Sequence, residues 1–179
     1  MIIPITIEMI EQIYPDSTQI SRDTFVVPLN NGFAKYGIDT PAKISAFLAQ
    51  IGHESGQFRW LEEIASGAAY EGRVKSLGNT QVGDGRRYKG RGLMMTTGRA
   101  NYTKLSKWSG IDFVNNPEWL SLPKYAALSA FYFWDSNNLN RYATFNDKDF
   151  ETLTRRINGG LNGYKDRKEI WERAKKVLA

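Results

Sequence analysis

One apolar stripe on a predicted helix most constrains how this chain can fold. Thr40 and Pro41 are typical of a helix N-cap and first helical residue. Four apolar residues follow at helical spacing: Ile44, Phe47, Leu48 and Ile51. Three residues later the same face reaches Glu54, within His53-Glu54-Ser55. A carboxylate on such a face either finds a partner or keeps its proton to a higher pH, as a general acid must. The alternative is a helix-end glutamate that turns to solvent.

Composition limits the classes of protein that this chain can belong to. Its 179 residues, 41% of them hydrophobic, are enough for one domain, or for one core split into two small lobes. The absence of cysteine excludes disulfides and thiolate metal sites. The only histidine, His53, cannot form a zinc site with other imidazoles. We therefore expect no metal and no cofactor.

The charge is basic and unevenly distributed. The net charge is +5 and the sequence pI is about 9.4. Basic residues gather between Arg73 and Arg99 and again from Lys165 onward. Such patches attract nucleic acid, membrane head groups or acidic polymers, unless they are only a solvated face. Nucleic acid is disfavoured because the aromatic residues follow helix-core spacing and do not alternate with arginines.

Hydrophobic periodicity predicts a mainly α chain. Residues 65–92 are rich in glycine and read as a long loop or a small β element. A loop of this length in a compact domain is usually functional. The predicted helices cover residues 6–14, 22–36, 40–54, 97–108, 123–137, 150–157 and 165–179.

Hydrolysis of a sugar bond would need a second carboxylate besides Glu54. Glu62 and Glu63 are the nearest candidates. In an unbroken helix nine residues rotate by about half a turn, which would direct Glu63 away from Glu54. The two can share a cleft only if the helix ends between them, and Gly56 is the obvious place.

Several motifs, in the same order, resemble glycoside hydrolase family 19, and the spacing is closest to its short bacterial and phage members. The resemblance runs from Asp39 to the C-terminus. The motifs are His53-Glu54-Ser55-Gly56, Phe58, Glu62-Glu63, Tyr70-Glu71-Gly72-Arg73, Leu77-Gly78-Asn79-Thr80, Gly83-Asp84-Gly85, Tyr88-Lys89-Gly90-Arg91-Gly92-Leu93, Thr97-Gly98-Arg99, Asn101-Tyr102 and Ile157-Asn158-Gly159-Gly160.

The resemblance implies a role for individual residues. Glu54 would be the general acid, Glu63 the general base, and Thr97 the residue that positions the attacking water. The residues implied in substrate binding are Asn158, which would bind the N-acetyl sugar, Arg167, which would pair with acidic groups, Tyr88 and Arg91. Three of these residues have structural alternatives. Thr97 can cap a helix, Asn158 can be a turn residue, and Arg91 can serve loop geometry alone.

Two positions depart from the family pattern. Met95 stands where the family usually has a sugar-contacting glutamine, and Asn162 stands where plant members carry glutamate. Asn162 removes one charge from the expected Arg167 network and favours the endolysin branch. Glu71 has no derivable chemical role, and we expect it to form a structural ion pair with Arg73 or Arg91.

The resemblance implies a mainly α, lysozyme-like single catalytic domain over residues 1–179. Two lobes around a cleft are an alternative form of the same domain. No separate wall-binding module is expected. The expected function is an inverting endolysin of phage or prophage origin that cuts β-1,4 bonds of bacterial peptidoglycan. A chitinase and a lytic transglycosylase are the enzymatic alternatives.

The expected setting of the protein follows from the same inferences. The N-terminus has no signal-peptide pattern, so the protein would be made in the host cytoplasm and act in the periplasm or cell wall after release by a holin-type pore. We expect a monomer that binds peptidoglycan strands. The basic C-terminal helix is a candidate contact for an anionic membrane surface.

Overall fold

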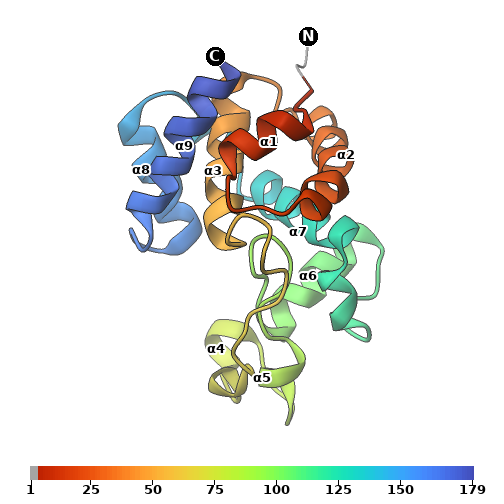
Figure 1. Cartoon of the computed structure of the whole chain (residues 1–179). Helices are drawn as coiled ribbons and strands as arrows, with labels where there is room; N and C mark the ends of the chain where they lie inside the picture. The colour runs from red at the N-terminus through yellow and green to blue at the C-terminus, as the bar shows by residue number, and fades with distance from the viewer. Residues whose placement is uncertain (1–3) are drawn as a thin grey trace. The chain divides into compact units, whose positions relative to one another are not determined.

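The protein is described here by a computed structural model that covers residues 4–179 (Figure 1). Residues 1–3, which open the apolar N-terminal segment, lie outside the described part. The described chain is mainly helical, which confirms the predicted class. It divides into two compact units, residues 4–59 with 133–179 and residues 60–132. None of the helices in residues 4–179 combines the length and apolar character needed to cross a bilayer.

The first unit consists of helices that begin where the sequence offers caps. Thr6, Thr18 and Thr40 each accept a hydrogen bond from the backbone N–H three residues later. The last turn of α7 (Pro123–Ser136) also belongs to this unit. The other elements are α1 (Ile7–Ile13), α2 (Gln19–Lys35), α3 (Pro41–Glu54), η3 (Leu139–Tyr142), α8 (Asp147–Asn158) and α9 (Tyr164–Leu178).

Helix α2 is longer and more regular than its sequence indicates. The prediction began it at Arg22, but the Thr18 cap starts it at Gln19, and it continues through Pro28 without a break. Proline removes one helical hydrogen bond, so packing must hold this helix together. Three side chains at spacings of four residues are buried along it: Phe25, Leu29 and Phe33.

Helix α3 is the central helix of the first unit. Every residue from 44 to 52 is buried, and α3 packs along α9 (Figure 1). Phe47 lies edge-on to both Phe33 and Trp134, with ring centroids 5.5 and 5.1 Å apart. Burial of these rings fixes α3 in place, and its last residue is Glu54.

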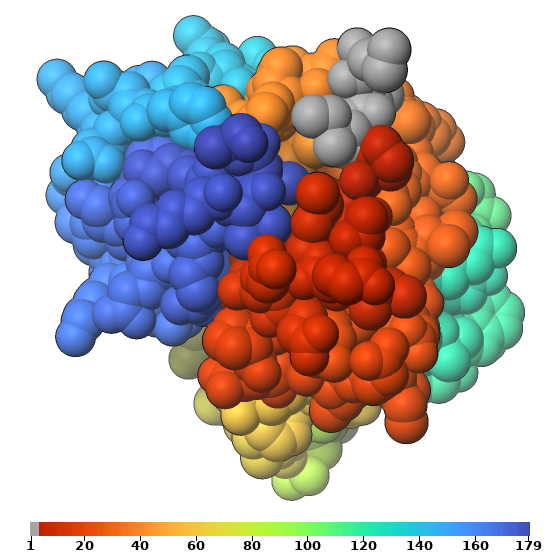
Figure 2. All heavy atoms as spheres, turned by 45° about the horizontal axis from the view of Figure 1, so that its top comes forward, coloured from red at the N-terminus to blue at the C-terminus, as the bar shows by residue number. Residues whose placement is uncertain are grey.

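Helix α9 also packs against α1, and Figure 2 shows the two side by side on the surface. The Arg173 Nε donates a hydrogen bond to the Ile13 carbonyl, which joins the two helices. Trp171 is fully buried and stacks on Phe150 of α8 at 4.2 Å. The apolar side of α9 is therefore used within the first unit, and its outward side carries the basic residues.

The chain leaves the helical direction directly after α3, at the place that the sequence predicts. Gly56, Gln57 and Phe58 all have positive φ, at 57°, 59° and 71°. Glycine adopts this conformation freely, but the other two residues do so at a cost. Packing offsets that cost for Phe58, whose ring contacts Tyr14 and Phe25 with centroids 4.8 and 4.5 Å apart.

The second unit contains short helical turns around a small aromatic core. Tyr88, Tyr102 and Phe113 are fully buried in that core, together with Leu105 and Leu120. Most of α7 lies in this unit. Its other elements are η1 (Ala68–Tyr70), α4 (Val74–Leu77), α5 (Asp84–Arg87), α6 (Arg99–Ser109) and η2 (Pro117–Ser121).

The glycine-rich segment 65–92 forms helical turns, and this corrects the alternative of a small β element. Within the described chain, β structure is limited to isolated bridges of Arg91 with Glu62 and with Thr96. These bridges still align three segments, because Glu63 N donates to Gly90 O at 2.9 Å and Arg91 N donates to Thr96 O at 3.1 Å. Candidate residues from separate motifs thereby come together.

Candidate active site

The first group of candidate residues surrounds Glu54 at the end of α3. We call it the Glu54 cluster, and it comprises Gln50, Glu54, Thr154, Asn162 and Arg167, all in the first unit. Arg167 Nη2 donates to Glu54 Oε1 at 2.6 Å. Arg167 is 1% exposed and the Glu54 side chain 21% exposed. The carboxylate on the apolar stripe has thus found a partner, and its side chain keeps some access to solvent.

Arg167 is itself fixed by two further acceptors. Its Nη1 donates to Gln50 Oε1 at 2.6 Å, and its Nε donates to the Asn162 carbonyl at 3.1 Å. The Gln50 amide in turn donates to Thr154 Oγ1 at 3.0 Å. A buried guanidinium held at all three nitrogens has one orientation, so it presents Glu54 in one position.

Gln50 is a member of this cluster that the sequence analysis missed. It is fully buried on α3, one helical turn before Glu54. The signal was present, because a polar residue at i−4 lies on the same face as the candidate acid. Asn162 participates differently from the expectation. Asparagine in place of the plant glutamate removes a charge, yet the backbone carbonyl of Asn162 still accepts a hydrogen bond from Arg167.

Asn158 and His53 lie beside the Glu54 cluster in the first unit. Asn158 is the exposed last residue of α8, and its Oδ1 accepts from Asn162 N at 3.3 Å. Its predicted contact with an N-acetyl sugar stays a prediction. His53 Nδ1 lies 2.7 Å from Asp166 Oδ2, so the one histidine ties the end of α3 to α9.

The second group surrounds Glu63 in the second unit. We call it the Glu63 cluster, and it comprises Glu63, Tyr70, Gly90, Met95 and Thr97. Tyr70 Oη donates to Glu63 Oε2 at 2.9 Å. Partial burial, and then the hydrogen bond to Glu63, raise the pKa of Tyr70 above its ordinary value, so the hydroxyl remains a donor at neutral pH. Glu63 Oε1 is buried, and no group in residues 4–179 donates to it.

Gly90 leaves the space between Glu63 and Thr97 open. A Cβ atom on Gly90 would lie 3.2 Å from Glu63 Oε2 and 3.3 Å from Thr97 Oγ1. Both oxygens therefore border the Gly90 backbone. The Thr97 hydroxyl donates to the Met95 carbonyl at 2.9 Å, so its lone pairs remain available as acceptors. Thr97 is not a helix cap, because α6 begins at Arg99 with Gly98 at the N-cap position.

Tyr88 and Arg91 occupy structural positions. Tyr88 is fully buried, and its hydroxyl donates to the Val114 carbonyl at 2.8 Å. Arg91 Nη1 donates to the Arg87 carbonyl and to Tyr102 Oη, at 2.8 and 3.1 Å. These contacts hold the loop that carries Gly90, and substrate contact by either residue stays a prediction.

The contacts of Glu71 show that the predicted ion pair is wrong. Glu71 forms no ion pair with Arg73 or Arg91. Its Oε1 accepts from Gly83 N at 2.7 Å and its Oε2 from Gly85 N at 2.8 Å. Backbone N–H groups of a glycine-rich turn thus replace the expected arginine. Glu62 is the residue that pairs with cations, namely Lys89 at 2.8 Å and Arg91 at 3.6 Å.

The described residues contain no grouping of three or more histidine and acidic side chains suited to holding a metal ion. The chemistry available at these clusters is that of two carboxyl groups with different partners. Glu54 is paired with the Arg167 guanidinium. Glu63 is held by the neutral Tyr70 hydroxyl, and the Thr97 hydroxyl beside it is available as an acceptor.

Comparison with known proteins identifies glycosyl hydrolase family 19 proteins among the relatives of the chain. The chain is 30% identical over 168 residues to a glycosyl hydrolase family 19 domain-containing protein of Haemophilus influenzae, and the match covers 76% of this chain and 80% of the relative. It is 33% identical over 142 residues to an Arabidopsis thaliana endochitinase, covering 78% of this chain but only 47% of that protein. No protein-family profile matches the chain.

Solved structures show the same fold. A bacterial family 19 chitinase superposes with a TM-score of 0.77 at 19% identity, covering 99% of this chain and 96% of the other. Chitinase C from Streptomyces griseus gives a TM-score of 0.76 at 18% identity, covering 97% of this chain and 76% of the other. The predicted lysozyme-like helical fold is confirmed by this likeness.

Proposed function

Because the chain belongs to glycoside hydrolase family 19, we propose that it hydrolyses β-1,4 bonds between N-acetylated sugars by inversion, with bacterial peptidoglycan as its substrate. Glu54 acts as general acid and Glu63 as general base. The observation that carries this assignment is the Glu63 cluster, in which Glu63 Oε2 and Thr97 Oγ1 both border Gly90 and the Thr97 hydroxyl is oriented as an acceptor.

The Glu63 cluster suits a water that attacks a sugar. A water molecule has two hydrogens, one for the Glu63 carboxylate and one for Thr97 Oγ1. Since the Thr97 proton is committed to Met95, Thr97 can only accept, and the water then presents its lone pair to the anomeric carbon. Glu63 takes up the proton as the new C–O bond forms.

The Glu54 cluster suits proton donation to the leaving oxygen. Oε1 of Glu54 is engaged by Arg167, so Oε2 is the oxygen that would deliver the proton to the glycosidic oxygen. Once the proton has left, the Arg167 guanidinium stabilises the carboxylate that remains. Inversion follows if the acid and the water act on opposite faces of the sugar ring.

The choice of peptidoglycan rests on charge and on Asn162, which stands where plant members of the family carry glutamate and favours the endolysin branch. Peptidoglycan carries peptide carboxylates, and a protein of net charge +5 is attracted to such a polymer. Chitin, a neutral polymer, is the second candidate, because several relatives are named endochitinases. The chain matches only 47% of the length of the Arabidopsis relatives, so their activity alone does not decide the matter.

Mass spectrometry of digests tests the proposal. Purified peptidoglycan and chitin oligosaccharides are each incubated with the full chain, with Glu54→Gln as the inactive control. We expect disaccharide-peptide products with free reducing ends from peptidoglycan. Anhydro-sugar products would assign a lytic transglycosylase, and cleavage of chitin oligosaccharides alone would assign a chitinase.

A further inference from the structure

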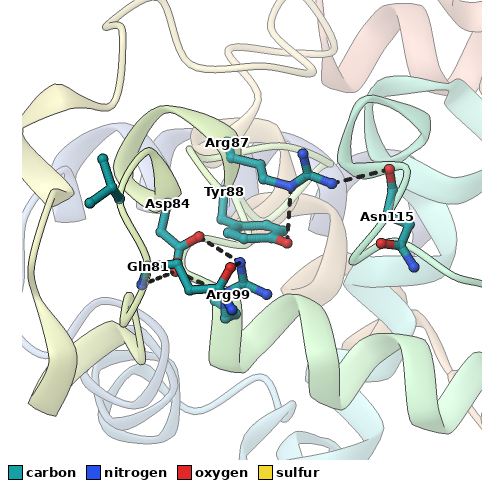
Figure 3. Close-up of a pocket in the computed structure, with 7 residues that line it drawn as sticks. Gln81, Asp84, Arg87, Tyr88, Arg99 and Asn115 are labelled. Carbon is teal, nitrogen blue, oxygen red and sulfur yellow. Dashed lines mark hydrogen bonds and ion pairs between the residues drawn. The ribbon is translucent and has the colours of Figure 1, made fainter.

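The second unit contains a pocket that the proposed reaction does not use. Its volume is about 470 Å³, and Figure 3 shows the side chains around it. None of the residues that line it belongs to the Glu63 cluster. They are Gln81, Val82, Asp84, Arg87, Tyr88, Arg99 and Asn115.

Two guanidinium groups face this pocket from either side of one aromatic ring. Arg99 Cζ lies 4.9 Å from the centroid of the Tyr88 ring and Arg87 Cζ lies 5.7 Å from it (Figure 3). The Tyr88 hydroxyl accepts from Arg87 Nε at 3.1 Å. Both cations are thereby fixed by stacking as well as by hydrogen bonds.

Each guanidinium keeps one nitrogen unused. Arg99 donates from Nε and Nη2 to the Asp84 carboxylate, and Arg87 donates from Nη2 to the carbonyls of Val114 and Asn115. In residues 4–179 neither Nη1 has a hydrogen-bond acceptor. The pocket therefore offers two preorganised cationic donors. The Gln81 amide lies beside them and accepts from Arg99 Nη2 at 3.0 Å, while the Asn115 amide already donates to Asp112 at 2.6 Å.

The charge of the pocket favours a ligand with one negative charge. Asp84 is 1% exposed, and the Arg99 guanidinium holds its pKa below the usual range, so it stays ionised. Among the lining residues its charge cancels that of Arg99, which leaves the charge of Arg87. A carboxylate balances one positive charge, whereas a phosphate dianion would exceed it.

The pocket lies close to the Glu63 cluster along the chain. Tyr88 lines the pocket and Gly90 borders Glu63 and Thr97, and two residues span at most about 7 Å. Hydrogen bonds also connect the two places. Arg99 N donates to Asn79 Oδ1, and Asn79 Nδ2 donates to the carbonyl of Tyr70, whose hydroxyl binds Glu63.

We infer that this pocket, here called the Arg87 pocket, is an accessory site for a carboxylate group, with Arg87 and Arg99 as its donors. In its biological use, which rests on the proposed function, the carboxylate is one carried by the peptide of a peptidoglycan strand while a sugar of that strand lies at Glu63. A neutral glycan lacks that group and gains nothing from this pocket.

A small probe tests the pocket independently of hydrolysis. N-acetylmuramoyl-L-alanyl-D-isoglutamine carries one carboxylate and no bond between two sugars. It is titrated into the full wild-type chain while the arginine Nε–Hε signals are followed by NMR, and its carboxamide analogue is titrated in parallel. We expect the acid to shift the Arg87 and Arg99 signals and the amide to leave them in place.

Variants then locate the effect. Arg87→Gln should weaken probe binding about tenfold, because it removes a charge-assisted donor. Arg87→Lys keeps the charge without the planar fork, so its affinity for the probe should lie between those of wild type and Arg87→Gln. The matched control is Arg86→Gln, an adjacent exposed arginine that does not line the pocket and should bind the probe like wild type. Backbone spectra verify that each variant is folded.

Three outcomes would overturn the inference. Equal shifts with the acid and the amide would remove the carboxylate from the interaction. Equal weakening by Arg86→Gln would reduce it to general surface charge. Inorganic phosphate, titrated in a separate arm, would reassign the pocket if it bound more tightly than the acid. The digests described above fail or succeed independently, because the probe contains no bond that the enzyme could cut.

Discussion

The Tyr70 hydroxyl donates a 2.9 Å hydrogen bond to Glu63 Oε2, while Oε1 of the same carboxylate is buried without a donor among the described residues. One oxygen is thus positioned by the protein and the other is left for a different partner. Tyr70 is therefore a positioning residue for the proposed base.

Tyr70→Phe tests this positioning role. The substitution deletes the hydroxyl and keeps the ring, so we expect kcat to fall about tenfold, within the range of losses caused by a misplaced catalytic group. KM and the melting temperature should change little, because the Tyr70 side chain is only partly buried. A purely structural role would instead lower the melting temperature and leave kcat intact.

Glu54→Gln tests the proposed acid. The amide keeps the shape and the acceptor oxygen for Arg167 but has no transferable proton, so kcat should fall by about 10² to 10⁴. The control is Glu151→Gln, a half-buried glutamate on α8 that pairs with Arg155. Lysis and oligosaccharide turnover are both measured. A folded Glu54→Gln variant with the wild-type rate would end the assignment.

Arg167→Ala should reduce both stability and activity. Removal of one partner from a buried ion pair costs about 3 kcal/mol, because the other groups lose their donor. Here Glu54, Gln50 and the Asn162 carbonyl would all lose one. Denaturant unfolding measures the change in free energy. Arg167→Lys should recover part of the stability but less activity, since a lysine cannot bind three separated acceptors in one plane.

Inversion predicts both a distance and a product. The carboxyl groups of Glu54 and Glu63 should stand roughly 6.5–9.5 Å apart when a sugar chain is bound, which leaves room for the water. A crystal structure with an oligosaccharide would measure this separation. Fresh product from a β-linked substrate should be the α-anomer by NMR, and an initial β-anomer would exclude the pairing.

We expect the ionised Asp84 carboxylate to make the protein less stable in acid. The pKa of this carboxylate is lowered in the folded state by the hydrogen bond from Arg99, so its contribution is complete above the unfolded value of about 3.9 and is lost as pH falls through the folded pKa. Asp84→Asn should lower the free energy of unfolding at pH 7 and flatten its decrease below pH 4. Arg99→Gln should produce the same flattening, which calorimetry across pH can verify.

The sequence predicted the Glu54 position well because amphipathic periodicity and a Thr-Pro cap are local signals. It predicted the segment 65–92 less well. Its four-residue helices α4 and α5 are too short to form alone and depend on contacts such as those of Glu71 with Gly83 and Gly85. A carboxylate that binds backbone N–H groups leaves no charge pattern in a sequence.

The start of α6 illustrates the same limit. Thr97 matched the pattern of a helix cap, yet its hydroxyl binds the Met95 carbonyl and the helix begins two residues later. Whether the Thr97 hydroxyl caps the helix or binds the Met95 carbonyl depends on the neighbouring segment of Gly90 and Arg91. Only the folded chain reveals that segment. The partners of Gln50, Thr154 and Arg167, are distant in sequence, so its role depends on the folded chain. Tyr70 lies only seven residues from Glu63, but its sequence does not show that its hydroxyl binds that carboxylate.

The pairing of Glu54 with Arg167 also has a consequence for biosynthesis. The two residues are 113 positions apart, and Arg167 belongs to the last helix, α9. A ribosome-bound chain that has emerged only through α8 contains Glu54, but it lacks the guanidinium that orients it. Since such distant contacts form late in folding, the acid would be positioned only after α9 has emerged from the ribosome. Before that point the chain has reduced activity, as expected for Arg167→Ala.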